Sequence, residues 1–66
     1  MTLDRVRALM VYLIPMGKVT KKLLQTKKEL SEEDIQFLID EEYIIPCGRN
    51  SEEKQLYCAS EKGKKL

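Results

Sequence analysis

The sequence predicts a small α+β domain in which three helices are followed by a two-stranded β-hairpin. The chain has 66 residues, enough for one domain over residues 1–66 with a single hydrophobic core. Apolar residues recur at helical spacing up to about residue 42. Residues 43–45 and 55–59 are instead rich in β-branched and aromatic side chains, and turn-forming residues separate them. The chain is therefore expected to end in an antiparallel hairpin.

The first helix is expected to begin after Thr2, which is a good N-cap residue, and to stop at Pro15. Gly17 is a second break in the pattern. Residues 9–14 are apolar at every position, and such a helix needs burial on more than one side. The alternatives are an overpacked core, a short strand over residues 11–14, or contact with a second copy of the chain. The predicted dimer interface consists of Leu9, Val11 and Tyr12.

The next two helices carry opposite charges. Thr20 is the expected cap of a second helix that runs to about Lys28, and residues 18–30 have a net charge of +4. Ser31 and Asp34 have the spacing of a capping box, which begins a third helix that runs to about Glu42. Residues 31–43 have a net charge of −6. Any function proposed for the chain has to explain this basic block beside an acidic one.

The hairpin is expected to turn at residues 48–51, with Pro46 on an edge strand. If the turn centres near Ser51, Cys47 lies opposite about Gln55 and Cys58 lies opposite about Ile44, so a disulfide between the two cysteines is disfavoured. Residues 60–63 end the second strand and can begin a last helical turn. Tyr43 and Tyr57 are expected to pack at the base of the hairpin.

Composition argues against several kinds of chemistry. The chain has no histidine and only three glycines, so imidazole catalysis and glycine-rich phosphate loops are excluded. The acids lack the spacing of a calcium loop, and so short a chain can hardly enclose a catalytic pocket. We expect no enzyme activity, no cofactor and no metal. Because neither a signal peptide nor a membrane span is visible, we expect an intracellular, cytoplasmic protein with reduced thiols and no membrane partner.

The order of elements and two local stretches resemble the winged-helix (winged helix-turn-helix) superfamily. "FLIDEEYIIPCG" looks like the end of a third helix passing into the first wing strand. "LYCASEKGKKL" is similar to the second wing strand and to the Tyr-x-Leu-Thr-x-Lys-Gly ending of small prokaryotic regulators. Tyr57, Lys62 and Gly63 match that ending, whereas Ala59 and Ser60 depart from it. The resemblance implies a three-helix winged helix with a C-terminal hairpin wing.

The resemblance also implies DNA binding with the third helix in the major groove. The third helix departs from this role, because it carries six acids and no Lys or Arg. One hypothesis is therefore a small transcriptional regulator, a homodimer, that binds double-stranded DNA through the second helix and the wing. Its DNA-binding residues are predicted to be Lys18, Lys21, Lys22, Lys27, Lys28, Gln36, Arg49, Asn50 and Lys54.

Two alternatives remain open at this point. The acidic third helix can bind a basic protein partner or the lysine-rich face of another copy. That interaction surface is predicted to consist of Glu32, Glu33, Asp40 and Glu41. The other alternative is that both charged faces are simply solvated.

Overall fold

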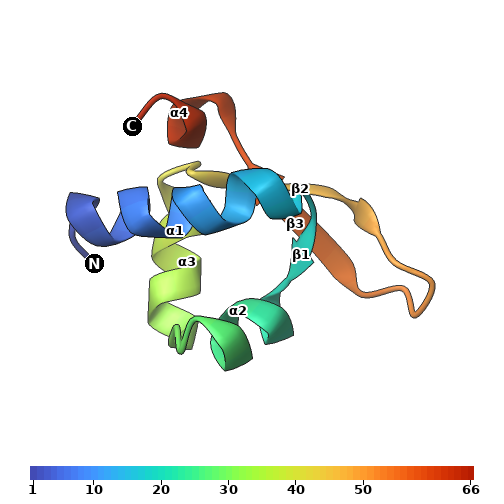
Figure 1. The fold of residues 1–66 in the computed structure, drawn as a ribbon. Helices are drawn as coiled ribbons and strands as arrows, with labels where there is room; N and C mark the ends of the chain where they lie inside the picture. The colour runs from blue at the N-terminus through green and yellow to red at the C-terminus, as the bar shows by residue number, and fades with distance from the viewer.

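The computed structural model describes all 66 residues, which form four helices and a three-stranded antiparallel sheet (Figure 1). The predicted α+β class is confirmed, and the arrangement is compatible with a winged helix. The elements follow one another as α1 (Leu3–Met16), β1 (Val19–Thr20), α2 (Lys21–Lys27), α3 (Glu32–Asp40), β2 (Ile44–Arg49), β3 (Gln55–Ala59) and α4 (Glu61–Lys64).

Each helix begins where a Ser or Thr side chain can satisfy a free backbone N–H group. The Thr2 and Thr20 hydroxyls accept hydrogen bonds from the backbone N–H groups of Arg5 and Leu23. The expected capping box is confirmed: Ser31 Oγ accepts from the Asp34 backbone N–H at 3.1 Å, and Asp34 Oδ2 accepts from the Ser31 backbone N–H at 3.3 Å. These caps explain why three of the predicted helix starts are correct.

The end of α1 differs from the prediction, because the helix continues through Pro15 to Met16. Proline removes one hydrogen bond, the one that Val11 O would accept. Val11 is 74% exposed, so this side of the helix faces water and tolerates the loss. Gly17 then ends the helix with φ +78° and donates its N–H to Leu13 O at 2.9 Å. The alternative of a strand over residues 11–14 is wrong.

The sheet has the order β1-β3-β2, so the hairpin is joined by a short strand that the sequence pattern did not predict. Thr20 pairs with Leu56, which ties the start of α2 to the hairpin. The predicted register of the hairpin is wrong: Cys58 lies opposite Ile45, and Gln55 lies opposite Arg49. The pairing is irregular between Pro46 and Arg49, and β2 continues to Arg49, so the turn begins at Asn50, two residues later than predicted.

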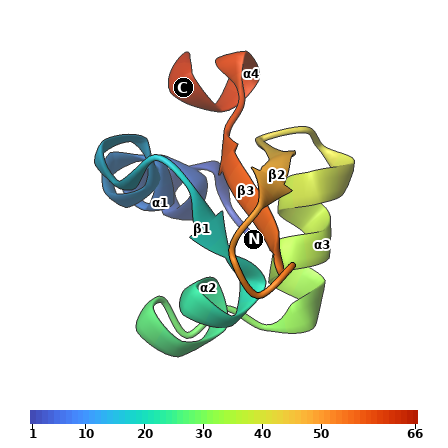
Figure 2. The same ribbon diagram turned by 90° about the vertical axis from the view of Figure 1, so that its right-hand side faces the viewer.

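The helices α1, α2 and α3 surround the inner face of the sheet, and the core lies between them (Figures 1 and 2). Tyr43 is part of this core and Tyr57 packs against it, as predicted. The tip of the hairpin extends beyond the helices at one end of the sheet, and α4 lies at the other end (Figure 1). The most deeply buried side chains are Val6, Leu13, Val19, Leu24, Ile35, Leu38 and Ile44.

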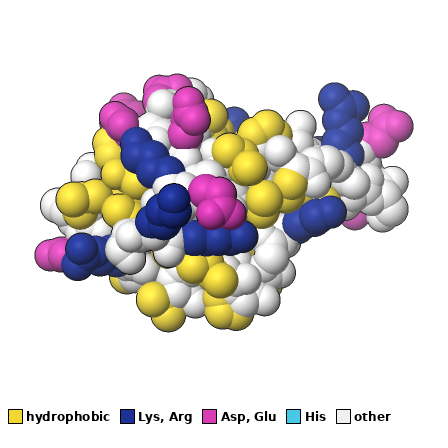
Figure 3. Space-filling view, turned by 90° about the horizontal axis from the view of Figure 1, so that it is seen from above, with side chains coloured by type: hydrophobic (Ala, Val, Ile, Leu, Met, Phe, Trp, Pro, Cys, Tyr) yellow, Lys and Arg dark blue, Asp and Glu magenta, His cyan; other side chains and the backbone are white.

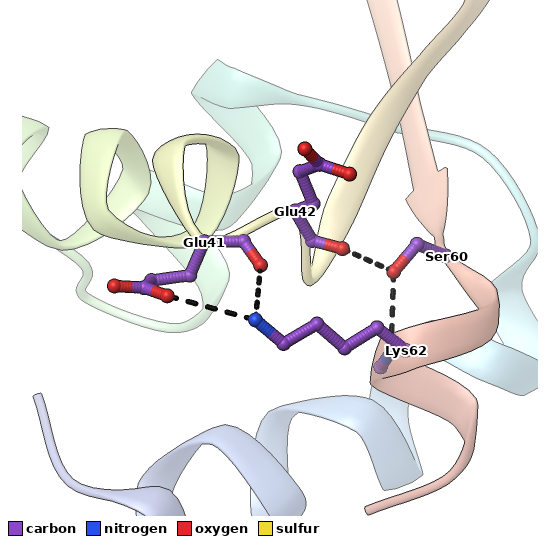
Figure 4. Close-up of polar contacts among 5 residues, drawn as sticks. Glu41, Glu42, Ser60 and Lys62 are labelled. Carbon is purple, nitrogen blue, oxygen red and sulfur yellow. Dashed lines mark hydrogen bonds and ion pairs between the residues drawn. The ribbon is translucent and has the colours of Figure 1, made fainter.

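The predicted last helical turn is confirmed as α4, which is fastened to the segment that follows α3 (Figure 4). Ser60 Oγ donates to the Glu42 carbonyl and accepts from the Gly63 N–H. Lys62 Nζ donates to the Glu41 carbonyl at 2.8 Å and lies 4.7 Å from the centre of the Tyr43 ring. A Cβ atom on Gly63 would lie 2.5 Å from the Tyr43 carbonyl oxygen, so only glycine fits there. The Lys-Gly pair of the C-terminal motif therefore has a structural role in this chain.

Candidate nucleic-acid interface

A polar cleft of about 750 Å³ lies between the start of α2 and the hairpin. Only one of its lining residues is hydrophobic. The antiparallel pair of Thr20 with Leu56 creates this cleft, because it holds the first turn of α2 beside β3. The lining residues are Thr20, Lys21, Lys22 and Gln25 on one side and Asn50, Glu52, Lys54, Gln55 and Tyr57 on the other.

The hairpin wall of the cleft is fixed by its own turn. Asn50 Oδ1 accepts hydrogen bonds from the backbone N–H groups of Glu52 and Lys54, both at 2.9 Å. The Gln55 side chain donates to the Gly48 carbonyl at 2.7 Å, which holds the two strands together across the irregular part of the ladder. The two bonds from Glu52 and Lys54 occupy the Asn50 side-chain oxygen, but the Asn50 amide nitrogen is free to donate.

Three lysines gather around this cleft, and none of them forms an ion pair. Lys21, Lys22 and Lys54 line it, and Glu52 is the only acid among the lining residues. The one ion pair in the structure joins Lys62 to Glu41 at 3.6 Å, and neither of these residues lines the cleft. The cleft is therefore a concave surface with several free donors and an excess of positive charge, which suits an anionic ligand such as a phosphate group.

The structure brings together only some of the residues predicted to bind DNA. Lys21, Lys22, Asn50 and Lys54 line the cleft. Five others lie outside its lining: Lys18, Lys27, Lys28, Gln36 and Arg49. Lys28 Nζ lies 4.2 Å from the centre of the Tyr12 ring, and the Gln36 amide donates to Asp40 Oδ1 at 2.8 Å. Gln36 is thus already engaged within α3, although it was the one residue of this helix with base-reading chemistry.

The exposed acids of α3 mostly have partners within the chain. Glu32 accepts from the Gln25 amide at 3.2 Å, and Asp40 accepts from Gln36. Glu41, just after the helix, forms the ion pair with Lys62. Glu33 is exposed and makes no side-chain hydrogen bond within the chain. Three of the four acids on the predicted protein-interaction surface therefore already bond to side chains of this chain.

The predicted dimer residues do not share one surface. Leu9 is only 4% exposed and belongs to the core of its own chain, so its place in a dimer interface is wrong. It points inward because it is three residues after Val6 and four before Leu13, on the buried side of α1. Tyr12 is half-buried beneath Lys28, whereas Val11 is the most exposed large hydrophobic residue of the chain.

The two cysteines are free and lie on the hairpin strands. Burial raises the pKa of the Cys47 thiol, and a hydrogen bond with the Cys58 side chain raises it further. The charge of Lys18 acts in the opposite direction but is the smaller effect. Cys47 is therefore held as a thiol and is a poor nucleophile at neutral pH. Histidine, cysteine and acidic side chains form no group of three that could hold a metal ion.

Comparison of the chain with protein-family models, curated proteins and solved structures finds no match. None of the helices has both the length and the apolar character needed to cross a bilayer. The role of the cleft therefore has to be inferred from its own side chains. Sequence reasoning missed Thr20, Gln25, Glu52, Gln55 and Tyr57 as parts of this surface. The only signal for them is the pairing of β1 with β3, and a strand of two residues has no periodicity to detect.

Proposed function

We propose that this chain is a winged-helix domain that binds double-stranded DNA through the cleft between α2 and the hairpin, as a small transcriptional regulator. The observation that carries the proposal is the group of three unpaired lysines around the cleft: Lys21, Lys22 and Lys54. Binding of duplex DNA depends mainly on cations that neutralise phosphates. The order of helices and strands and the match of Tyr57, Lys62 and Gly63 to the wing ending support the winged-helix assignment.

The proposed docking differs from insertion of α3 into the major groove. The exposed side of α3 is acidic and would repel the phosphates on either side of the groove. Its single amide, Gln36, is bound to Asp40. We therefore propose that α2 and the hairpin contact one backbone of the duplex, while α3 faces away from it. In this arrangement the Asn50 amide nitrogen is a further donor to a phosphate or a base edge.

Fluorescence anisotropy with a labelled duplex of about 20 base pairs tests this proposal, at two or more salt concentrations. Three phosphate contacts predict a slope of about −2.7 for the logarithm of affinity against the logarithm of salt. The variant Lys21→Glu/Lys22→Glu/Lys54→Glu is expected to bind roughly 100-fold more weakly or worse. The matched control is Lys27→Glu/Lys64→Glu/Lys65→Glu, which has the same net charge and alters exposed lysines outside the cleft.

Equal losses in the two triple variants would contradict a role of the cleft, because net charge alone would then explain the binding. Absence of binding by the wild-type protein at low salt would reject DNA as the ligand. The remaining candidate would be a basic protein partner on α3. Glu33 is the acid of that surface with no side-chain partner in the chain, so Glu33→Lys should weaken such a complex most directly.

A further inference from the structure

The two cysteines lie on neighbouring strands and share one face of the sheet. The register predicted from the sequence places Cys58 opposite Ile44, three residues before Cys47, and an odd offset puts the two side chains on opposite faces. The structure pairs Cys58 with Ile45 instead, two residues before Cys47. Because side chains alternate between the faces of a strand, this even offset returns Cys47 to the face of Cys58. The observed register therefore removes the reason for excluding a disulfide between them.

The irregularity in β2 begins at Cys47. Pro46 pairs with Tyr57, and before the next regular pair β2 has one residue more than β3. An extra residue of this kind is a β-bulge, which bends the strand and changes the direction of a side chain. Gly48 takes up the bend with φ +114°. Across the two strands, the Cys47 and Cys58 thiols are in contact through a hydrogen bond.

A lysine lies beside the two thiols. Val19 pairs with Tyr57, so continuing this register by one residue places Lys18 at the level of Cys58. Burial raises the pKa of the Cys47 thiol, and the positive charge of Lys18 offsets part of this effect. Both cysteines are only half-buried, so each sulfur is held by the sheet and is still open to a small reactant. Two adjacent thiols that a small reactant can reach are the arrangement that forms a disulfide by exchange.

We propose that Cys47 and Cys58 are a redox site, in which a small-molecule disulfide such as glutathione disulfide oxidises the two thiols to a disulfide that cross-links the hairpin. The Cys58 thiolate attacks one sulfur of the oxidant, the S–S bond of the oxidant breaks, and one molecule of thiol leaves. The Cys47 sulfur then displaces a second molecule of thiol from the mixed disulfide on Cys58. The two cysteines lose two electrons and two protons, which leave in the two thiol products. This step does not depend on the proposed DNA binding.

The disulfide closes a loop that contains the whole tip of the hairpin. Asn50 and Lys54 of the cleft lie within this loop. Figure 3 shows the tip projecting from the body of the molecule, with charged side chains on it. In the reduced protein, the Gln55 side chain bridges the irregular part of the ladder through its hydrogen bond to the Gly48 carbonyl. A covalent link at the same place restricts the conformations of the tip further, and so fixes one wall of the cleft.

Equilibration of the wild-type protein in glutathione redox buffers tests the thiol pair, with free thiols alkylated after acid quenching and counted by mass spectrometry. The equilibrium constant for the disulfide should be at least about tenfold larger in the folded protein than in denaturing guanidinium chloride, because the sheet holds the two sulfurs together. The matched control is Cys47→Ser/Ser51→Cys, which moves one thiol to the exposed turn and closer to Cys58 along the chain.

In denaturant the wild type and this control should oxidise almost equally, because loop closure depends only weakly on loop length. In the folded state the wild type should form the disulfide much more readily than the control. A wild-type constant that is no larger in the folded protein than in denaturant would overturn the proposal. So would a folded control that oxidises as readily as the wild type.

Amide hydrogen exchange tests the effect on the hairpin. The Asn50 N–H donates to the Lys54 carbonyl at 3.1 Å, and oxidation is expected to slow its exchange at least about threefold. The Gly17 N–H, which donates to the Leu13 carbonyl at 2.9 Å at the end of α1, is the control. No slowing at Asn50, or equal slowing at Gly17, would contradict a cross-link that acts on the hairpin.

The redox site and the DNA-binding cleft can fail independently. Cys47→Ser/Cys58→Ser should bind duplex DNA as strongly as the reduced wild type, because neither cysteine lines the cleft. Lys21→Glu/Lys22→Glu/Lys54→Glu should still form the disulfide, because it retains both thiols and Lys18. Loss of the disulfide in this cleft variant would contradict a redox site that needs only the two thiols and Lys18.

Discussion

Polar side chains at one end of the sheet bond to other parts of the chain, whereas the lysines at the other end form no ion pair. At the α4 end, Ser60 and Lys62 each bond to the segment after α3, and Lys62 also pairs with Glu41. At the hairpin end, Lys21, Lys22 and Lys54 surround a cleft that one acid, Glu52, also lines, and none of the three lysines forms an ion pair. Like charges held close together reduce stability, so the hairpin end is not arranged for stability alone. Departures of this kind are expected where a protein binds a ligand.

The largest effect on stability is expected from a change at the α4 end. Gly63→Ala should lower the free energy of unfolding by about 2 to 3 kcal/mol, because the new Cβ has no room. It would lie 2.5 Å from the Tyr43 carbonyl oxygen and 2.9 Å from Met10 Sδ. Urea denaturation followed by circular dichroism measures this loss. Lys64→Ala is the control in the same helical turn, and a similar loss there would show that close packing is not the cause.

A smaller loss is expected when the cap of α4 is removed. Ser60→Ala deletes the hydroxyl that donates to the Glu42 carbonyl and accepts from the Gly63 N–H. The expected loss is about 1 to 2 kcal/mol, since Ser60 is buried and two backbone groups lose their partner. Ser51→Ala, in the exposed turn of the hairpin, should change the free energy of unfolding by less than about 0.5 kcal/mol. Equal losses of unfolding free energy in Ser60→Ala and Ser51→Ala would show that the Ser60 hydroxyl does not stabilise the α4 end specifically.

The sequence predicts where the helices begin better than it predicts how the helices and strands pack together. The helix starts follow from Thr2, Thr20 and Ser31, whose side chains act on residues only three positions away. β1 is invisible in the sequence, because two residues carry no pattern and its pairing with β3 spans more than 30 positions. The cleft depends on this pairing, so its lysines could be predicted individually but not as a group.

The end of α1 and the hairpin register show the same limit. Pro15 is a strong stop signal, but the lost hydrogen bond falls on the exposed side of the helix and the last turn continues. The register depends on the irregularity between Pro46 and Arg49, where β2 continues past Gly48. Leu9 falls in the predicted dimer interface because its whole segment is apolar, and composition alone does not tell which side of a helix faces the core.

The smallest expected effects come from two substitutions that compare the ends directly, since each removes one lysine charge. They are Lys62→Met at the α4 end and Lys54→Met at the hairpin end. Lys62→Met keeps an apolar stem over Tyr43 but loses the bond to the Glu41 carbonyl and the ion pair. Because Lys62 and Glu41 are both about half exposed, the expected loss is only about 0.5 to 1 kcal/mol.

Lys54→Met removes a cation that has no partner within the chain, so the free energy of unfolding should stay within about 0.5 kcal/mol of the wild type or rise. Both values come from urea denaturation at low salt, where repulsion among the cleft lysines is least screened. Added salt should then stabilise the wild type more than Lys54→Met, because salt screens a repulsion that the variant has already reduced. If Lys54→Met were the more damaging of the two, the cleft lysines would be supporting the fold, and the case for an anionic ligand would lose its main observation.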